Sequence, residues 1–503
     1  MAARLLETEV LVVGAGPVGL MLAGELRLGG AGTVVLERRS APTTESRAST
    51  LHARTMELFD SRGLLDALGT PPDEPRGHFG GVPLDLTLPS PWPGQWKVPQ
   101  TRTEELLQEW ALGLGADLRR GHDLRAVRVA EDHVEAVAAG PGGRTLRIRA
   151  RYVVGCDGEN STLRRLTGAE FPGQDASREL LRADVAGVDI PNRRFQRLEK
   201  GLAIAARRAD GITRIMVHEF GAAAGPRVTE PEFAEVAQVW KRVTGEDVSG
   251  GTPLWVNSFG DANRQLAEYR RGPVLFAGDA AHQQMPIGGQ ALNLGLQDAV
   301  NLGWKLAAEV RGRAPAGLLD TYHTERHTVG RRVLSNIRAQ ALLLLGGPEV
   351  EPVRTLLAEL IATRPEVRTH LAGMISGLDI RYGAADLADP LLGTRLPYTE
   401  LTCPAGPLST TELLRTAGRG LLLDLAGDAG LRTAARPWAD RVVTVAARPA
   451  GDGPLGAARA LLVRPDGYIA WTGGEDDVET ALDNWFGPAR RSVAISGRNS
   501  DRN

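Results

Sequence analysis

A glycine-rich segment near the N-terminus constrains the fold of this chain more than any other feature. The apolar run Val10–Val13 precedes Gly14-Ala15-Gly16-Pro17-Val18-Gly19, and residues with helical periodicity follow. This strand–turn–helix context is the one that a dinucleotide-binding fingerprint requires. Glycines lack Cβ atoms, so the backbone can turn tightly and approach a pyrophosphate, which the helix N-terminus stabilises. The segment therefore predicts a Rossmann-like α/β unit at the start of the chain.

A carboxylate follows at the distance from the glycines at which such units bind the ribose. Thr33–Leu36 has the pattern of a second strand, and Glu37 ends it. A carboxylate about 20 residues beyond the glycines can accept hydrogen bonds from ribose hydroxyls. We therefore expect Glu37 to hold the ribose.

Two later segments suit the rest of one ligand. They are Cys156-Asp157-Gly158 and Gly278-Asp279-Ala280-Ala281-His282. A buried strand expected over 274–277 would put Asp279 where a carboxylate can hold the ribityl or pyrophosphate part of a flavin. Asp157 has two open interpretations, a cofactor contact or a cap for the helix that follows. For His282, a structural hydrogen bond is favoured over proton transfer.

The loop that comes next completes the predicted flavin site. It reads Pro286-Ile287-Gly288-Gly289-Gln290-Ala291-Leu292-Asn293. Apolar residues then recur at helical spacing up to Ala307, which predicts a helix that begins at Asn293. The positive end of this helix would face the pyrimidine ring of the flavin and stabilise its anionic reduced form.

The order and length of these motifs resemble the class A FAD-dependent aromatic hydroxylases, in the branch that acts on aromatic polyketides in angucycline biosynthesis. The resemblance covers nearly the whole chain and includes Ser46-Arg47-Ala48, Val98-Pro99-Gln100-Thr101 and the run from Asp298 to Leu306. It implies FAD contacts at Val18, Glu37, Arg38, Arg47, Gln100, Leu124, Thr162, Asp279, Leu292 and Asn293. The motifs add Gly14, Gly16, Pro17, Gly19, Asp157, Gly278, Pro286, Gly289, Gln290 and Ala291 to the expected cofactor site. No catalytic residue is identified from the sequence.

The resemblance also implies a reaction. It implies noncovalent FAD that is reduced by NADPH, and a flavin C4a-hydroperoxide, formed with molecular oxygen, that hydroxylates a polycyclic aromatic polyketide in antibiotic biosynthesis. The sequence holds no second glycine fingerprint, so we expect the nicotinamide to dock transiently. Two alternatives on the same scaffold stay open: Baeyer–Villiger insertion or dehydrogenation, and a non-catalytic flavin-bound partner protein.

One residue departs from the usual loop pattern of this family. Ala291 stands where the pattern P-x-G-G-Q-G-x-N has its last glycine. If that position required a positive φ, alanine would be strained there by about 1 kcal/mol or more. We expect flavin binding to survive and the oxygen chemistry to be the property affected.

Composition limits the partners of the chain. Its 503 residues, 42% of them hydrophobic, can bury a large core in two or three domains, and a net charge of −2 argues against a nucleic-acid partner. Only Cys156 and Cys403 are present, so we expect no disulfide framework, no dithiol relay and a cytoplasmic location. No run approaches the roughly 20 apolar residues of a membrane span, and no metal site is expected. The oligomeric state is open, with a homodimer as one option.

The expected fold class is α/β. A Rossmann-like FAD-binding domain is interrupted by a mixed-sheet substrate domain, and the resemblance adds a C-terminal thioredoxin-like domain. The predicted ranges are 1–76, 99–173 and 261–340 for the FAD-binding domain, 77–98 and 174–260 for the substrate domain, 341–389 for a helical connector, 390–490 for the thioredoxin-like domain and 491–503 for a polar tail. Cys403 has no partner cysteine nearby, so this last domain is expected to be structural rather than redox-active.

Two local predictions concern elements around the site. Ala209-Asp210-Gly211 predicts a hairpin turn between strands over 201–207 and 212–220. Thr101 and Glu104 have the spacing of a capping box for a helix over 101–114, which would present Gln100 just ahead of its start.

Overall fold

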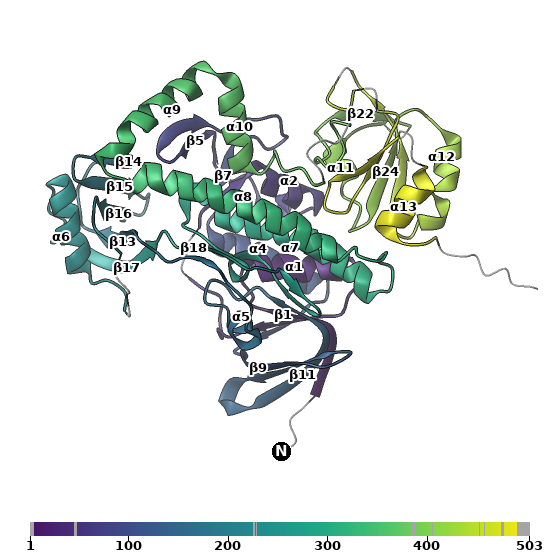
Figure 1. Cartoon of the computed structure of the whole chain (residues 1–503), viewed down its shortest axis with the longest axis horizontal. Coiled ribbons are helices and arrows are strands. Elements are labelled where there is room, and N and C mark those ends of the chain that lie inside the picture. Colours follow the sequence, from purple (N-terminus) through teal and green to yellow (C-terminus); the bar gives the residue numbers. More distant parts are fainter. Residues whose placement is uncertain are drawn as a thin grey trace, which may run out of the picture.

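The computed structural model describes residues 5–44, 48–224, 227, 229–383, 389–404, 406–451, 453–456, 458–473 and 477–489. The expected cofactor contact at Arg47 and the predicted tail over 491–503 lie outside these residues. Figure 1 shows a central body crossed by the long helix α8 (Asp320–Leu345), with a C-terminal lobe at one side. None of the described helices is long and apolar enough to cross a membrane.

The central sheet has the parallel core of a Rossmann-like unit. Its strands lie in the order β19-β20-β11-β1-β2-β8, and the pairs from β20 to β8 are parallel. Their bounds are β1 Leu5–Val13, β2 Thr33–Glu37, β8 Asp117–Arg120, β11 Thr145–Gly155, β19 Arg270–Arg271 and β20 Val274–Phe276. The antiparallel strands β9 (Asp123–Val129) and β10 (Val134–Ala139) extend the sheet beside β11. The predicted strands of this unit are thus present.

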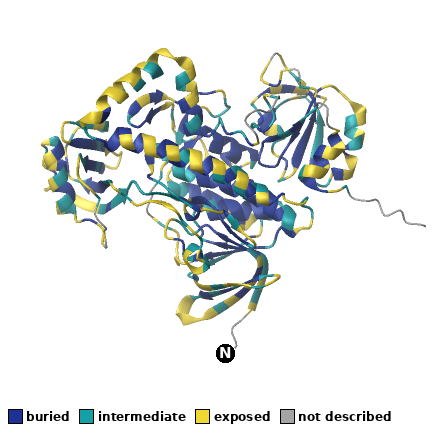
Figure 2. Cartoon of the chain, in the orientation of Figure 1, coloured by how far each residue is buried: buried dark blue, intermediate teal, exposed yellow. Residues whose placement is uncertain are grey.

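Helix α1 (Pro17–Leu28) packs closely between α4 (Gln100–Gly113) and α7 (Gln290–Val310). A Cβ atom at Gly24 would lie 1.9 Å from the ring of Trp110, and one at Gly303 would lie 2.3 Å from Cβ of Glu25. These two glycines therefore allow the neighbouring helices to approach without a gap. Figure 2 shows that the helices beneath α8 are mostly buried.

The start of α7 differs from the prediction. The helix begins at Gln290 rather than at Asn293. Gly288 and Gly289 take positive φ angles of 65° and 69° and form a left-handed turn. Because this turn ends at Gly289, the helix starts three residues before the position that the apolar periodicity predicts.

The predicted capping box of α4 is wrong. The helix begins at Gln100 after Pro99, and no side chain caps it. The carboxylate of Glu104 instead accepts a hydrogen bond from Nε2 of Gln100 at 2.8 Å. Once Gln100 belongs to the helix, its side chain lies one turn from Glu104 and competes for that carboxylate.

The inserted sheet has the strand order β14-β15-β16-β13-β17. Its strands are β13 Glu179–Ala186, β14 Arg193–Leu198, β15 Gly201–Arg207, β16 Thr213–Glu219 and β17 Thr252–Gly260. All four pairs are antiparallel, which differs from the mixed sheet expected above. Short connections such as the predicted turn at Asp210 and Gly211 explain this, because a hairpin joins antiparallel strands. Helix α6 (Phe233–Thr244) covers one face, where Trp240 is fully buried.

The two helices that follow α8 pack against a hairpin from an earlier part of the chain. Helices α9 (Glu351–Thr363) and α10 (Pro365–Ser376) lie near the hairpin of β5 (Arg76–Phe79) and β6 (Val82–Asp85), with which they share an apolar cluster. Helix α9 has no buried residue and is largely exposed in Figure 2. Helix α8 continues past the boundary expected at 340, and the predicted domain boundaries stay a prediction.

The C-terminal lobe has the strand order expected of a thioredoxin-like domain, β25-β24-β27-β28. Strand β24 (Gly420–Asp424) is parallel to β25 (Val442–Ala446) and antiparallel to β27 (Ala460–Val463), which pairs with β28 (Ile469–Thr472). Helices α12 (Ala429–Ala434) and α13 (Val478–Phe486) complete it. Cys403 is a buried free thiol on β22 (Glu400–Cys403), outside this four-stranded sheet.

A turn of the lobe places charged side chains in the interior of the central body. Arg464 donates to both carboxylate oxygens of Glu325 on α8, at 2.6 and 2.8 Å, and Nζ of Lys305 on α7 donates to the same carboxylate at 2.7 Å. Asp466 pairs with Arg464, and its backbone oxygen accepts from Arg54 at 2.7 Å. None of these five side chains is more than 9% exposed. These buried charges join the lobe to α7 and α8.

The pKa of Glu325 reflects this environment. Burial alone would raise its pKa, but Arg464 and Lys305 more than offset that effect and hold the pKa well below its usual range. A carboxyl group whose pKa is lower in the folded state contributes stability above its unfolded pKa of about 4.3, and that contribution is lost as the pH falls further.

We predict that Glu325→Gln lowers the free energy of unfolding by about 3–5 kcal/mol at pH 7, because removal of one partner leaves buried charges uncompensated. The matched control Glu105→Gln, in an exposed pair with Arg102, should cost less than about 1 kcal/mol. Urea unfolding measures both. Below about pH 4 the difference in the free energy of unfolding between Glu325→Gln and the parent protein should decrease, since protonation removes the contribution of the Glu325 carboxylate. Equal costs for the two substitutions at pH 7 would contradict this assignment.

Candidate functional site

The three glycine motifs meet at one edge of the central sheet. Strands β20, β11 and β1 are parallel neighbours, and each motif follows the C-terminal end of one of them. The ends are in register, because Val13 pairs with Gly155 and Gly155 with Phe276. In open parallel sheets, ligands bind outside this edge of the strands. The segments singled out in the sequence are thus brought together where a dinucleotide would bind.

The first motif has the shape of a pyrophosphate-binding turn. Gly14 has a φ of +104°, and a Cβ there would lie 2.4 Å from the backbone oxygen of Cys156. A Cβ at Gly19 would lie 1.9 Å from the backbone oxygen of Gly14, whereas one at Gly16 would meet nothing within 4 Å. Gly16 also precedes α1 without any side-chain cap, and Pro17 is its first residue. Open space in front of an uncapped helix N-terminus fits a bound pyrophosphate.

Glu37 lies beside this turn at the end of β2. Its two carboxylate oxygens accept hydrogen bonds from the backbone nitrogens of Ala15 and Arg39, both at 2.9 Å. The carboxylate is half-buried and keeps further lone pairs for ribose hydroxyls. The adjacent Arg38 is exposed.

The third motif contacts the first through small residues. Gly278 has a φ of +63°, and a Cβ there would lie 2.9 Å from a methyl group of Val18. A Cβ at Gly295 of α7 would lie 3.1 Å from Cα of Gly278. Asp279 is exposed between the buried Gly278 and Ala280, so its carboxylate is at the surface of this edge.

A buried carboxylate holds the third motif in place. Asp298 of α7 is 0% exposed; it accepts from the backbone nitrogen of Gly278 at 3.1 Å and from Nε2 of His282 at 2.8 Å. Nε of Arg326 on α8 donates to its other oxygen at 2.7 Å. Burial would raise the pKa of Asp298, but Arg326 and His282 together lower it. The structural interpretation of His282 is therefore confirmed.

The loop before α7 is fastened to strand β3 (Thr50–His52). The side chain of Asn293 accepts from the backbone nitrogen of His52 at 2.8 Å and donates to the backbone oxygens of Thr50 and Gly289. A ring nitrogen of His52 hydrogen-bonds the backbone oxygen of Gly288 at 2.8 Å. Burial lowers the pKa of His52 to about 4, so the ring is neutral at pH 7. Asn293 is thus a positioning residue for the loop.

Ala291 lies in the first turn of α7 and is half-buried. Among the residues that the structure describes, positive φ angles outside glycine occur only at Phe195 and Ala417. The strain considered for alanine at this position therefore does not arise, because a helical φ suits alanine better than glycine. The methyl group still adds volume at the end of α7 that the expected flavin would face.

Gln290, the first residue of α7, belongs to a buried row of amides. Nδ2 of Asn336 donates to Oε1 of Gln290 at 3.2 Å, and Nε2 of Gln340 donates to Oδ1 of Asn336 at 3.1 Å. Oε1 of Gln340 then accepts from the backbone nitrogen of Gly80 at 3.2 Å. The row runs through α8 and connects the β5–β6 hairpin to the edge of the central sheet where the three motifs meet, which we call the cofactor edge.

The cap interpretation of Asp157 is supported by its hydrogen bonds. Its Oδ2 accepts from the backbone nitrogens of Thr162 and Leu163, at 2.6 and 3.1 Å, and its Oδ1 accepts from the hydroxyl of Ser161. The residue thereby orients the start of α5 (Thr162–Thr167) at the same edge of the sheet. Thr162 itself is half-buried there.

The other expected contacts lie in varied surroundings. Gln100 is half-buried and accepts from the backbone nitrogen of Ala48 at 3.2 Å. Leu124 is a buried core residue on β9, 3% exposed, so only its backbone or one edge of its side chain could reach a ligand. Leu292 is half-buried beside the core, and Pro286 is exposed at the start of the loop.

Sequence reasoning missed the residues that brace the site from behind. Asp298 lies in a motif that carries the family resemblance, but no role was expected for it, and neither His52 nor Arg326 was expected to act in the site. A charged residue in the middle of an apolar helix is the signal that could have identified Asp298, because such a charge must be paired when buried.

An apolar wall lies between the inserted sheet and the loop before α7. We use this name for Leu180, Leu202, Met216, Phe220 and Phe259 of the sheet together with Met285 and Ile287 of the loop, which form one cluster. A polar cavity of about 330 Å³ adjoins it at Met285 and is lined by residues that include Gln174, Arg178, Asp261 and Asn263. Leu180, Leu202, Met285 and Ile287 are each at most 5% exposed, so the apolar wall packs the inserted sheet against the loop.

The chain matches known protein families over most of its length. Residues 7–337 match the family described as FAD binding domain, and residues 389–489 match the one described as aromatic-ring hydroxylase, C-terminal. The chain is 42% identical to the 12-dehydrotetracycline 5-monooxygenase/anhydrotetracycline 6-monooxygenase of Streptomyces rimosus, over 95% of this chain and 99% of the relative. It is 40% identical to the dialkyldecalin synthase of Streptomyces rugosporus, over 95% and 99%.

A solved structure agrees with these matches. CabE, an aromatic hydroxylase from angucycline biosynthesis, superposes with a TM-score of 0.92 at 52% identity, over 96% of this chain and 100% of CabE. The chain therefore contains an FAD-binding domain. The chain belongs to the FAD-dependent aromatic hydroxylases, the class A flavoprotein monooxygenases.

Proposed function

We propose that the protein is an FAD- and NADPH-dependent monooxygenase that hydroxylates a polycyclic aromatic polyketide of the angucycline type. The observation that carries this proposal is the cavity of about 330 Å³ that adjoins the apolar wall at Met285. A cavity of this size with both aliphatic and polar lining residues suits a small-molecule ligand. The similarity to CabE supports an angucycline-type substrate.

We propose that FAD binds noncovalently along the sheet edge. The uncapped start of α1 suits the pyrophosphate, Glu37 the ribose and Asp279 the ribityl side of the cofactor. The first turn of α7 suits the pyrimidine ring. Because His52 is neutral at pH 7, the positive potential at this loop comes from the helix terminus rather than from that ring.

Bound FAD supplies the oxygen-activating chemistry, and the chain supplies binding, orientation and exclusion of water. The apolar wall keeps water from one side of the reacting centre. The loop before α7, fixed to β3 by hydrogen bonds, orients the substrate ring relative to the flavin. NADPH docks transiently in this proposal, since the sequence has one dinucleotide fingerprint.

Another reaction on the same scaffold is the second candidate. A relative at 40% identity is named for dialkyldecalin synthesis, and Ala291 replaces a family glycine at the expected flavin face. Baeyer–Villiger insertion, dehydrogenation or a flavin-bound protein without oxygen chemistry would each leave the FAD site intact. The product of the reaction distinguishes these outcomes.

Incubation with NADPH, labelled oxygen and a panel of tetracyclic quinones should give a product that is heavier by one labelled oxygen atom. NADPH oxidation should accelerate when an accepted phenolic polyketide is added, because substrate binding helps the flavin to reach the nicotinamide. Mass spectrometry and NADPH absorbance measure these effects. A product lacking two hydrogens would indicate dehydrogenation, and a ring-expanded product would indicate Baeyer–Villiger insertion. Equal NADPH rates with and without every polyketide would reject the hydroxylase.

Glu37→Ala and Asp279→Ala should each weaken FAD binding by roughly tenfold or more while the protein stays folded, because each removes a charged hydrogen-bond acceptor worth roughly 1.5–3 kcal/mol. Asp189→Ala, which removes a 97% exposed carboxylate on the inserted domain, is the matched control. FAD content after gel filtration and circular dichroism measure occupancy and folding. Unchanged occupancy in both variants would show that these carboxylates do not hold the cofactor.

Ala291→Gly tests the departure from the family loop. We expect FAD affinity to stay nearly constant and the ratio of hydroxylated product to hydrogen peroxide to change, because the methyl group faces the flavin rather than its phosphates. Ala308→Gly is the control, because Ala308 is also half-buried on α7 but far from the loop. It carries the same cost of replacing alanine by glycine in a helix, about 1 kcal/mol. Product per NADPH consumed is the readout. If both variants match the parent, the methyl group has no part in the oxygen chemistry.

A further inference from the structure

Helix α9 is more exposed than the other long helices of the protein. Among the helices of eight or more residues in the described part of the chain, it alone has no buried residue. Figure 1 places it at the outer margin of the molecule, and Figure 2 shows that most of its surface is exposed. A helix of this length has little stability of its own and depends on packing of its apolar face. Its exposed side therefore has the character of a contact surface.

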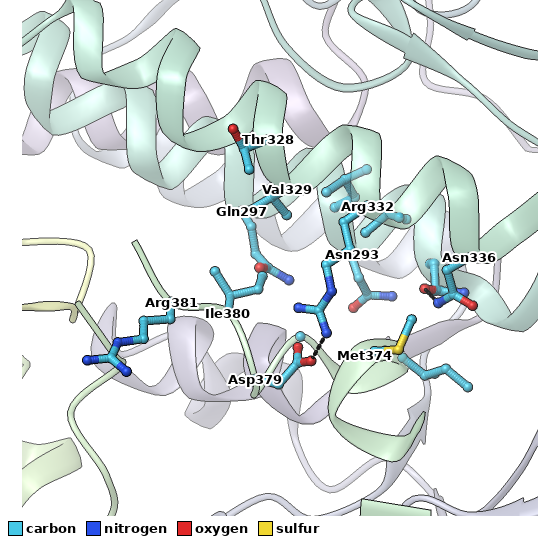
Figure 3. Close-up of a pocket in the computed structure, with 15 residues that line it drawn as sticks. Asn293, Gln297, Thr328, Val329, Arg332, Asn336, Met374, Asp379, Ile380 and Arg381 are labelled. Carbon is cyan, nitrogen blue, oxygen red and sulfur yellow. Dashed lines mark hydrogen bonds and ion pairs between the residues drawn. The ribbon is translucent and has the colours of Figure 1, made fainter. Parts of the chain in front are cut away.

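The inner side of α9 fixes the orientation of the helix. Leu357 and Ile361 pack against the apolar cluster that α10 and the β5–β6 hairpin share. Arg354 donates to a backbone oxygen near the end of α8 at 2.8 Å. Asp379, which follows α10, pairs with Arg332 of α8, as the dashed line in Figure 3 marks. Helices α9 and α10 are thus attached to α8, and the rest of α9 is turned outward.

Five residues at helical spacing form a stripe on the outward side. They recur every three or four positions and therefore share one helical face. We call this set the outer stripe: Glu349, Val353, Leu356, Leu360 and Arg364. Val353 and Leu356 are 57% and 56% exposed, and Leu360 is half-buried. Glu349, in the turn that leads into α9, and Arg364, at its C-terminal end, are both exposed. The outer stripe is thus apolar in the middle, acidic at its start and basic at its end.

The two charged ends of the outer stripe can accept further partners. Among the residues that the structure describes, no carboxylate pairs with Arg364. One carboxylate oxygen of Glu349 accepts from the backbone nitrogen of Gly347 at 2.9 Å. A carboxylate has further lone pairs for a guanidinium. Each end therefore offers one half of an ion pair.

The outer stripe is complementary to itself in the antiparallel direction. The midpoint between Val353 and Leu360 is also the midpoint between Glu349 and Arg364. When two copies of α9 align antiparallel about this midpoint, valine faces leucine and each glutamate faces an arginine. Leu356 of each copy then lies next to the twofold axis. A parallel pair would instead bring like charges together, so the charges favour the antiparallel one.

We propose that the outer stripe is a twofold symmetric contact between α9 helices of two copies of this chain, packed antiparallel. Such a contact is isologous, because the same patch of both copies is used. Helix α9 is about 20 Å long, and one pair of helices of this length buries less area than the roughly 1,200–2,000 Å² of stable complexes. The dimer is therefore reversible and dissociates on dilution.

Sedimentation velocity of the FAD-loaded protein over a range of concentrations tests the contact. The parent protein should change from monomer to dimer as its concentration rises. Leu356→Glu should raise the dissociation constant of the dimer at least tenfold, because it brings two carboxylates together at the twofold axis. Leu254→Glu, at a 57% exposed position of β17, is the matched control and should dimerise as the parent does.

Exchange of the charges tests the antiparallel alignment. Glu349→Arg and Arg364→Glu should each raise the dissociation constant several-fold, because each places like charges opposite one another. The double substitution should restore the dissociation constant of the parent, since both ion pairs form again with reversed sign. Circular dichroism checks that the helix content of every variant is unchanged.

Three results would overturn the proposal. A parent protein that stays monomeric at every concentration would reject the contact, and so would a dimer that Leu356→Glu leaves unchanged. A double variant that dimerises no better than the two single variants would reject the antiparallel alignment. None of these results depends on the reaction that the FAD-loaded protein catalyses.

Discussion

The geometry of the cofactor edge depends on the paired carboxylate of Asp298. It is fully buried in α7, and it binds the turn that carries Asp279, the ring of His282 and the guanidinium of Arg326. An unpaired carboxylate at this depth would be strongly destabilising, whereas here the partners lower its pKa despite burial. The turn, His282 and α8 are therefore held in one arrangement, because other arrangements would leave a charge alone in the interior.

Neighbouring residues of α8 extend this arrangement to the C-terminal lobe. Arg326 reaches Asp298, while Glu325 reaches Lys305 on the same helix α7 and Arg464 of the lobe. Helix α7 is thus joined to α8 by two ion pairs, Asp298–Arg326 and Lys305–Glu325. Arg464 attaches the lobe to the second pair. This gives a thioredoxin-like domain with a buried free Cys403 a structural connection to the site.

The elements with strong local signals were predicted closely. Strand β15 coincides with its predicted range and β16 lies within its own, because period-two patterns and turn residues are properties of short segments. Helix starts were less predictable. The capping box predicted at Thr101 was wrong because Gln100 joins the helix and its side-chain amide donates to the Glu104 carboxylate. Helix α7 begins three residues before the predicted start because Gly288 and Gly289 complete the preceding turn. These outcomes depend on backbone conformations that spacing alone does not specify.

The sequence by itself predicted which residues form the FAD site, because a glycine fingerprint and a ribose carboxylate are local patterns, and it determined the family through the order of its motifs. Tertiary structure decided what those residues do for one another. Asp157 caps α5, Asn293 fastens the loop to β3, and Ala291 is helical and unstrained. Burial and pairing are set by segments distant in the chain, so local patterns cannot encode them.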